Sequence, residues 1–312
     1  MTVKRLLIIS SFFMVLCIAV LFLTRPKASD SVMGKEDSSY LIEVPVYFSS
    51  ANQPCIDLEV ESQNLESMID LGFQGAIRID GSVLNKIKDK IFLRERTTWN
   101  VRGKEKKSKV FQIPRLKIGR LVFASPPVEE LSANSRDDVF FSENGRSISS
   151  KESCLLGWEL FEDTNLLLDF KNSRIIFCDS FQTLQKQGCF RGVFFKVPLL
   201  MNRGLLEVEA KTERGVIRCV LDTGSTWNIL NSPLSEGESF ETAIWDEGKV
   251  VKIEKFQLAK RDFGSIPFRS LPIQLPICVE AILGMEFLCD HLIFIDFANQ
   301  EIYFPEDRRD SV

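Results

Sequence analysis

Hydrophobic residues in most of this chain fall in short runs, and helical spacing is rare. The runs are rich in β-branched, aromatic and aliphatic residues, and Gly, Asn, Asp, Ser and Pro separate them, a pattern typical of β-strands. Two segments, NLLLDF–KNS–RIIF at 165–177 and HLIFIDF–ANQ–EIYF at 291–304, predict β-hairpins. The pattern therefore predicts an all-β fold.

Helical spacing is clearest after residue 82. Val83, Leu84, Ile87 and Ile91 would share one face of a helix, and Ser82 is placed to cap its first turn. Pro233 predicts the start of a second short helix, because proline favours the first helical position. We therefore expect only a few short helices among the strands.

The N-terminus carries a different pattern. Residues 6–23 form an uncharged apolar run, which as a helix would span about 27 Å and so cross a bilayer core. The following TRPKASD lacks the small-residue pattern of a cleavage site. We predict a single-pass membrane anchor within residues 1–24, a polar linker over 25–39 and the bulk of the chain on the non-cytoplasmic side. A cleaved secretory signal is the second interpretation.

The rest of the chain contains an internal repeat. CLLGWELFEDTNLLLDFKNSRIIF at 154–177 recurs as AILGMEFLCDHLIFIDFANQEIYF at 281–304, with Leu-Gly, Asp-Phe and the closing Phe at identical spacing. Upstream, EVPVYF and LEVE have counterparts in KVPLLM and LEVE, and both copies place Asp-x-Gly after an apolar run. The chain is therefore expected to hold two copies of one unit, over 40–180 and 190–305.

Composition narrows the chemistry. The net charge is −4, which argues against nucleic-acid binding through a basic face. His291 is the single histidine, so an H-E-x-x-H zinc site is excluded, and none of the eight cysteines forms C-x-x-C. We expect no metal site. Both mostly free thiols and one or two disulfides remain open. Among the kinds of catalytic chemistry, the composition mainly leaves catalysis by Asp and Glu carboxylates.

The sharpest motif is CVLDTGS at 219–225. An apolar run delivers Asp222 to a turn whose Gly224 allows close backbone approach, and Thr223 and Ser225 offer hydroxyls. Ile-Leu-Gly at 282–284 and the closing hairpin follow. Together these motifs resemble the aspartic protease superfamily, of the retropepsin-like and pepsin-like kind. With the repeat, the resemblance covers most of the chain.

The resemblance implies two lobes that each supply one aspartate to a shared site. In this chain these are Asp70 and Asp222, a pair within one monomer that shares a proton and activates water without a cofactor. Its substrate would be an extended peptide in the cleft between the lobes. The resemblance implies supporting roles for Gly72, Thr223, Gly224 and Ser225. It also implies a flap hairpin over 98–111, with Gly103 at the tip and Trp99 beside the substrate.

The first unit departs from the family pattern. Its motif reads D-L-G-F, so Leu71 and Phe73 stand where the family has hydroxyl side chains that link the lobes and hold the carboxylate. Two alternatives to a peptidase active as a monomer therefore stay open. One is a membrane-tethered binding module that has lost catalysis. The other is a homodimer in which two copies of Asp222 form the pair.

Overall fold

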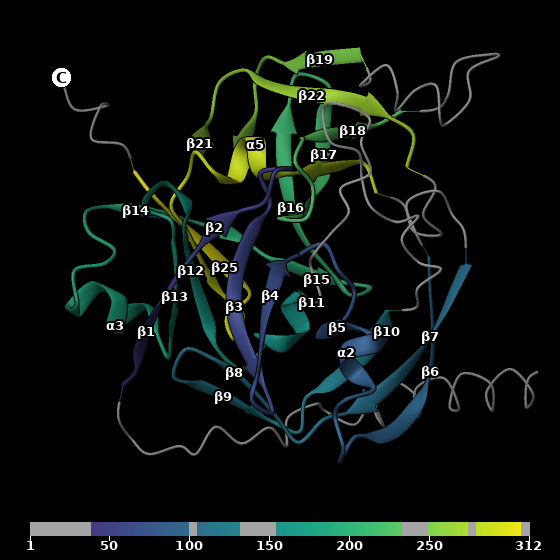
Figure 1. Ribbon diagram of the computed structural model, residues 1–312. Helices are drawn as coiled ribbons and strands as arrows, with labels where there is room; N and C mark the ends of the chain where they lie inside the picture. The colour runs from purple at the N-terminus through teal and green to yellow at the C-terminus, as the bar shows by residue number, and fades with distance from the viewer. Residues whose placement is uncertain (1–38, 100–104, 132–153, 233–248, 274–278, 307–312) are drawn as a thin grey trace, which may run out of the picture.

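The computed structural model describes residues 39–99, 105–131, 154–232, 249–273 and 279–306 (Figure 1). Within these ranges the chain forms three β-sheets and a few short helices. The helices are α2 (Gly81–Leu84), η2 (Trp158–Leu160), η3 (Phe170–Asn172), α3 (Phe181–Lys186) and α5 (Met285–Leu288). The all-β prediction with few helices is confirmed.

One sheet of six strands is built by both halves of the sequence. Its strands in spatial order are β1 (Leu41–Pro45), β13 (Arg174–Cys178), β12 (Asn165–Asp169), β24 (Ile293–Asp296), β25 (Glu301–Pro305) and β14 (Phe194–Pro198). Both predicted hairpins, β12–β13 and β24–β25, are confirmed. The halves meet where β12 pairs antiparallel with β24, with Leu167 opposite Phe294.

The second sheet comes entirely from the first half. Its strands in spatial order are β6 (Ile91–Trp99), β7 (Glu105–Gln112), β10 (Pro127–Leu131), β5 (Ile77–Asp80), β11 (Cys154–Leu156), β4 (Gln63–Ile69), β3 (Pro54–Val60), β8 (Arg115–Ile118) and β9 (Leu121–Ala124), with β2 (Tyr47–Phe48) paired to β3.

The third sheet comes from the second half. Its strands in spatial order are β19 (Lys249–Ile253), β22 (Ile266–Leu271), β18 (Ile229–Asn231), β23 (Ala281–Leu283), β17 (Gly215–Leu221), β16 (Leu205–Thr212), β20 (Gln257–Leu258) and β21 (Arg261–Asp262), with β15 (Leu200–Asn202) paired to β16.

The two large sheets have corresponding strand orders. In the first, β11 pairs parallel with β4 and antiparallel with β5; in the second, β23 pairs parallel with β17 and antiparallel with β18. The neighbouring parallel pairs, β5–β10 and β18–β22, also correspond. The repeated sequence thus produces the same pairing twice, and both sheets are curled (Figure 1).

The apolar core is continuous between the halves. Leu71 is buried in the same cluster as Leu221 and Leu283. The rings of Trp158 and Phe297 stack across the halves with centroids 6.3 Å apart. Full burial of a large apolar side chain contributes about 1.5–3 kcal/mol. The ends of β4 and β17, where the aspartates lie, are therefore held in a packed interior.

The predicted helix after residue 82 is shorter and starts earlier than expected. Asp80 is the cap, because its carboxylate accepts from the Ser82 amide at 2.7 Å, and the helix ends at Leu84. Ile91 begins a strand, since the main chain from Ile91 onward pairs with β7. The helix expected at Pro233 lies outside the described residues.

Two other predictions concern the whole chain. No helix in the described ranges is long and apolar enough to cross a membrane; the predicted span at 6–23 lies outside these ranges. No disulfide joins the six cysteines that the structure describes, at positions 55, 154, 178, 189, 219 and 289.

Candidate active site

Both aspartates of the repeated motif sit in the same kind of turn. Asp70 follows the last residue of β4, and its amide donates to the Leu156 carbonyl at 2.8 Å. Asp222 follows β17, and its amide donates to the Leu283 carbonyl at 3.0 Å. The parallel neighbour of each strand, β11 or β23, thus fixes where the chain leaves the sheet.

The glycines of the two motifs lie against the aspartate of the opposite half. A Cβ atom on Gly224 would lie 2.6 Å from Cγ of Asp70, and one on Gly72 would similarly overlap the carboxyl group of Asp222. Only a residue without a side chain allows this approach. The structure therefore brings Asp70, Gly72, Asp222 and Gly224 together at the junction between the halves.

Thr223 ties the two motifs together below the carboxyl groups. Its buried hydroxyl donates to the Ile69 carbonyl at 2.7 Å and accepts from the Leu71 amide at 3.0 Å. Leu71, its counterpart in the first half, is fully buried and has no hydroxyl to return the contact. The junction therefore has one threonine link where a symmetric pair would have two.

Two contacts that the sequence did not predict add to this single link. Gln53 donates from Nε2 to the Gly224 carbonyl at 2.6 Å, and the Thr226 hydroxyl donates to the Ala51 carbonyl at 2.7 Å. Both join the turn between β2 and β3 to the second motif. Neither residue belongs to a repeated motif, so no local signal identified them.

Thr223→Val should lower the free energy of unfolding by about 2–4 kcal/mol, because two buried main-chain groups lose their partner while the side-chain volume is kept. Denaturant unfolding measures this. Thr223→Ser keeps the hydroxyl and should lose far less. Thr226→Val, which removes one contact at a partly buried site, is the matched control and should cost about 1 kcal/mol. An unchanged midpoint for Thr223→Val would contradict the bridging role.

The carboxyl groups differ in their surroundings. Oδ1 of Asp222 accepts from the amides of Gly224 at 2.9 Å and Ser225 at 3.1 Å. Oδ1 of Asp70 is buried and has no hydrogen-bond partner among the described residues. The Ser225 hydroxyl was expected to hold the carboxylate, and this was wrong. It donates to the Trp227 carbonyl at 2.8 Å, so the main chain holds Asp222.

These surroundings affect the pKa values of the two aspartates differently. Burial raises the pKa of Asp70 well above its usual range, and the charge of Asp222 and the hydrogen bond between the two raise it further. Burial also raises the pKa of Asp222, but the hydrogen bond from Asp70 and the amides of Gly224 and Ser225 oppose this. More causes thus raise the pKa of Asp70 than that of Asp222, which favours a proton on Asp70 when the pair shares one.

A hairpin of the first half covers the segment in which a flap was predicted. β6 and β7 pair antiparallel up to Trp99 opposite Glu105, so the predicted hairpin over 98–111 is confirmed as a hairpin. The proposed tip, Gly103, and the side chain of Trp99 lie outside the described part of the chain. In the second half, only β19 of the corresponding region is described.

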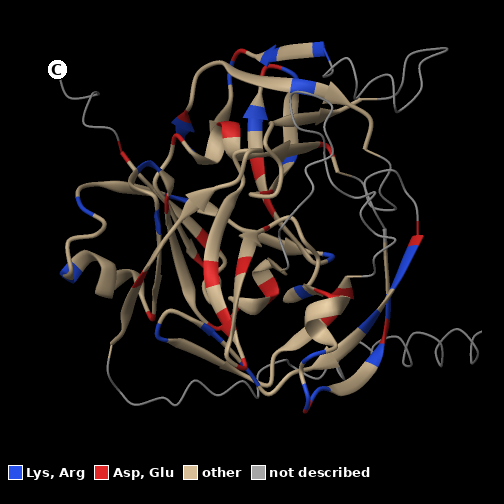
Figure 2. Ribbon diagram, viewed as in Figure 1, with Lys and Arg blue, Asp and Glu red and all other residues tan. Residues whose placement is uncertain are grey.

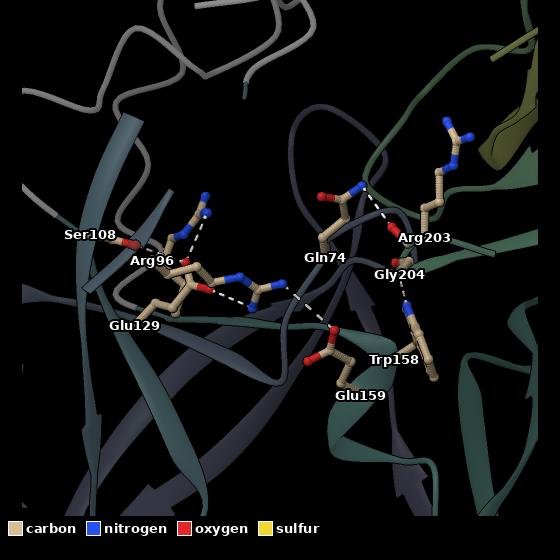
Figure 3. Close-up of polar contacts among 9 residues, drawn as sticks. Gln74, Arg96, Ser108, Glu129, Trp158, Glu159, Arg203 and Gly204 are labelled. Atoms are coloured by element: carbon tan, nitrogen blue, oxygen red, sulfur yellow. Dashed lines mark hydrogen bonds and ion pairs between the residues drawn. The ribbon is translucent and has the colours of Figure 1, made fainter. Parts of the chain in front are cut away.

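A buried ion-pair network joins this hairpin to the turn that carries Asp70 (Figure 3). Glu129, only 3% exposed, accepts from Arg96 at 2.8 Å and from Arg78 at 3.3 Å. Arg96 also lies 3.7 Å from Glu159, which stands two residues after the Leu-Leu-Gly element at 155–157. The guanidinium of Arg78 lies 4.4 Å from the centroid of the Phe73 ring. Phe73 thus packs where the family pattern has a hydroxyl.

Arg78→Met should raise the pKa of Asp70 further, because the Arg78 charge opposes the rise caused by burial and by Asp222. If Asp70 must hold a proton during turnover, the alkaline limb of the pH profile should move to higher pH. The pH dependence of kcat/KM measures this shift. Arg78→Lys keeps the charge and should restore much of the original profile. An unmoved alkaline limb in Arg78→Met would contradict the electrostatic link.

The remaining repeated aspartates, Asp169 and Asp296, have structural roles. Asp169 accepts from Asn172 and from Arg174 at 2.7 Å, and Asp296 accepts from the amide and side chain of Asn299. Each therefore holds the turn of its own hairpin. His291 stacks on Phe287, its Nδ1 lies 2.7 Å from the Phe287 carbonyl, and its ring also contacts Phe263 and Phe304, so it packs among aromatic side chains.

Comparison of the sequence with known protein families found no matching family, and comparison with curated proteins found no similar sequence. The site is therefore interpreted from its own geometry and from the motifs described above.

Proposed function

We propose that this chain is an aspartic endopeptidase of two lobes, 40–180 and 190–305, which hydrolyses peptide bonds with Asp70 and Asp222. The observation that carries the proposal is the reciprocal approach at the junction, where the glycine of each Asp-x-Gly motif lies against the aspartate of the other. Two aspartates that share a proton in this way are suited to general acid–base catalysis with water.

In the proposed reaction Asp222 is the base. It takes a proton from a water molecule as the water oxygen attacks the scissile carbonyl carbon, and Asp70 gives its proton to the carbonyl oxygen. The resulting tetrahedral diol collapses when the carbon–nitrogen bond breaks. Asp222, now protonated, gives its proton to the leaving nitrogen, and a hydroxyl of the diol returns a proton to Asp70 as the new carboxyl group forms. The amides of Gly224 and Ser225 favour the charged form of Asp222, so they support its role as the base.

The substrate in this proposal is an extended peptide that lies between the lobes and under the β6–β7 hairpin. Main-chain hydrogen bonds would hold it, and alternate side chains would enter pockets on either side. The proposal also includes a membrane anchor at residues 6–23, with both lobes on the non-cytoplasmic side and a monomer as the active form.

A catalytically inactive binding module is the second candidate, and the burial of Leu71 and Phe73 favours it. Both side chains are part of the interior, so the first motif is built for apolar contacts where the family pattern has hydroxyls. Such a module would keep the cleft and bind peptides without cleaving them.

A statine-containing peptide inhibitor distinguishes the two candidates. For a peptidase, we expect the full-length protein to cleave members of a mixed peptide library and the statine peptide to block that cleavage. Binding of the statine peptide by calorimetry without cleavage of any library member would favour the binding module. If the statine peptide does not bind and no library member is cleaved, both proposals are contradicted.

A further inference from the structure

The outer edge of the first large sheet carries three consecutive exposed apolar side chains. They are Ile91, Phe92 and Leu93, with exposed fractions of 60%, 54% and 46%. They open β6, the end strand of its sheet, which has one paired neighbour among the described strands. Side chains normally alternate between the faces of a strand, so three exposed in a row is unusual.

A β-bulge contributes to this exposure, together with the edge position of the strand. Phe92 pairs with Phe111 and Arg94 pairs with Val110, so Leu93 is an extra residue without an opposite partner. Phe92 makes one edge contact with Phe111, with ring centroids 5.8 Å apart. The bulge therefore presents Phe92 and Leu93 together at the same end of the strand.

Cationic residues flank this apolar group in the sequence. Residues 86–94 contain Lys86, Lys88, Lys90 and Arg94 against Asp89, a local charge of +3 in a chain whose net charge is −4. Lys86, Lys88 and Arg94 are exposed, while Lys90 is partly exposed and donates to the Ile87 carbonyl at 3.1 Å. Figure 2 shows Lys and Arg positions along β6 and β7, at the lower right of the view.

We propose that this basic apolar edge, residues 86–94, binds the surface of an anionic membrane. Ile91, Phe92 and Leu93 would enter the boundary between headgroups and acyl chains, and the cations would contact lipid phosphates. Apolar side chains flanked by Lys and Arg are the combination that holds proteins at such interfaces.

The same features disfavour a protein partner at this edge. The bulge interrupts the regular main-chain ladder, and bulges and lysines on edge strands oppose pairing with another strand. In a twofold dimer through this edge, the local charge of +3 would face its own copy. A lipid surface with negative charge can bind the apolar side chains through its acyl chains and the cationic side chains through its phosphates.

This inference is independent of the proposed catalysis. It also does not require the predicted span, although the two would act together. The fifteen residues 25–39 can reach at most about 50 Å, which lets the folded part lie on the bilayer beside the span. Two weak membrane contacts in one chain bind far more stably than either does alone.

Photo-crosslinking tests the proposal. The full-length protein carries benzoylphenylalanine at position 92, in nanodiscs of phosphatidylserine and phosphatidylcholine. The matched control carries it at Val216, which is 57% exposed and lies near Arg214 and Arg218 in the other half. We expect at least tenfold more lipid adduct at position 92. The double variant Lys86→Gln, Lys88→Gln should lower binding roughly fivefold for each cation removed.

Three outcomes would overturn the proposal. One is equal lipid adducts at positions 92 and 216, and another is a protein–protein adduct at position 92 in place of lipid. The third is the same yield in nanodiscs of phosphatidylcholine alone. If the probe at position 92 lowers the melting temperature, Ile91 provides a second position, since it is 60% exposed.

Discussion

Asp222→Asn is expected to abolish peptide hydrolysis, and Asp70→Asn is expected to do nearly the same. A fall in kcat/KM of about 10³-fold or more is expected for each, since each carboxyl group is half of one proton-sharing unit and general acid–base groups contribute 10²–10⁴-fold. The double variant should be little worse than either single one, because the two residues act together. Initial rates on a cleaved library peptide measure all three.

A stability measurement checks that Asp70→Asn acts on the proton-sharing pair. The pKa of Asp70 is raised in the folded state, so the unfolded carboxyl, with a pKa near 3.9, ionises first as the pH rises. The folded state therefore loses stability from about pH 4 up to the raised pKa. Asp70→Asn should remove this loss, and melting temperatures across that range would show it.

A substitution at an aspartate outside the pair provides the control. Asp179→Asn, at an exposed position, should leave turnover unchanged. If Asp70→Asn kept full activity while Asp222→Asn had none, a homodimer with two copies of Asp222 would be the better account. If neither substitution reduced turnover, the protein would not be acting as an aspartic peptidase.

Gly224→Ala is the second substitution for which we expect a large effect. Its added methyl group would lie 2.6–2.8 Å from Cγ, Oδ1 and Oδ2 of Asp70, so the carboxyl group or the turn must move. We expect at least a hundredfold loss of kcat/KM and a loss of about 1–3 kcal/mol in the free energy of unfolding, typical of overpacking. Steady-state kinetics and denaturant unfolding measure the two effects.

Gly81→Ala is the matched control, because its Cβ would meet the side-chain oxygen of Glu130 at 3.1 Å and that flexible side chain can move. It should leave turnover and stability near those of the unchanged protein. Wild-type turnover in Gly224→Ala would mean that Asp70 does not need its present position. That result would count against the shared site.

The fold and the site were predictable from the sequence where a pattern repeats. The hairpins around Asp169 and Asp296 were predictable because apolar runs of fixed length flank a short polar turn in both copies. The meeting of Asp70 and Asp222 was expected from the repeated Asp-x-Gly motif and the family resemblance, and both glycines lie at the junction. The supporting role that the resemblance implies for Thr223 agrees with its bond to the main chain of the other half.

Contacts that join segments far apart in the chain were not predictable from the sequence. Gln53 reaches the Gly224 carbonyl across 171 positions, and nothing beside it in sequence marks that contact. Arg78 and Glu129 meet because two parallel strands place them opposite each other, which no local pattern reveals. The helix after residue 82 was overestimated because pairing of β6 with β7 outweighed the helical spacing that included Ile91.

The pairing of β12 with β24 has a consequence for synthesis of the chain. The edge of β12 is covered by residues 293–296, which leave the ribosome only after most of the second half has been made. Until then the first half exposes the strand Asn165–Asp169 to neighbouring nascent chains. The six-stranded sheet therefore cannot form completely before β24 is made. Truncation before residue 293 should leave a fragment with an unpaired strand edge that is prone to aggregate.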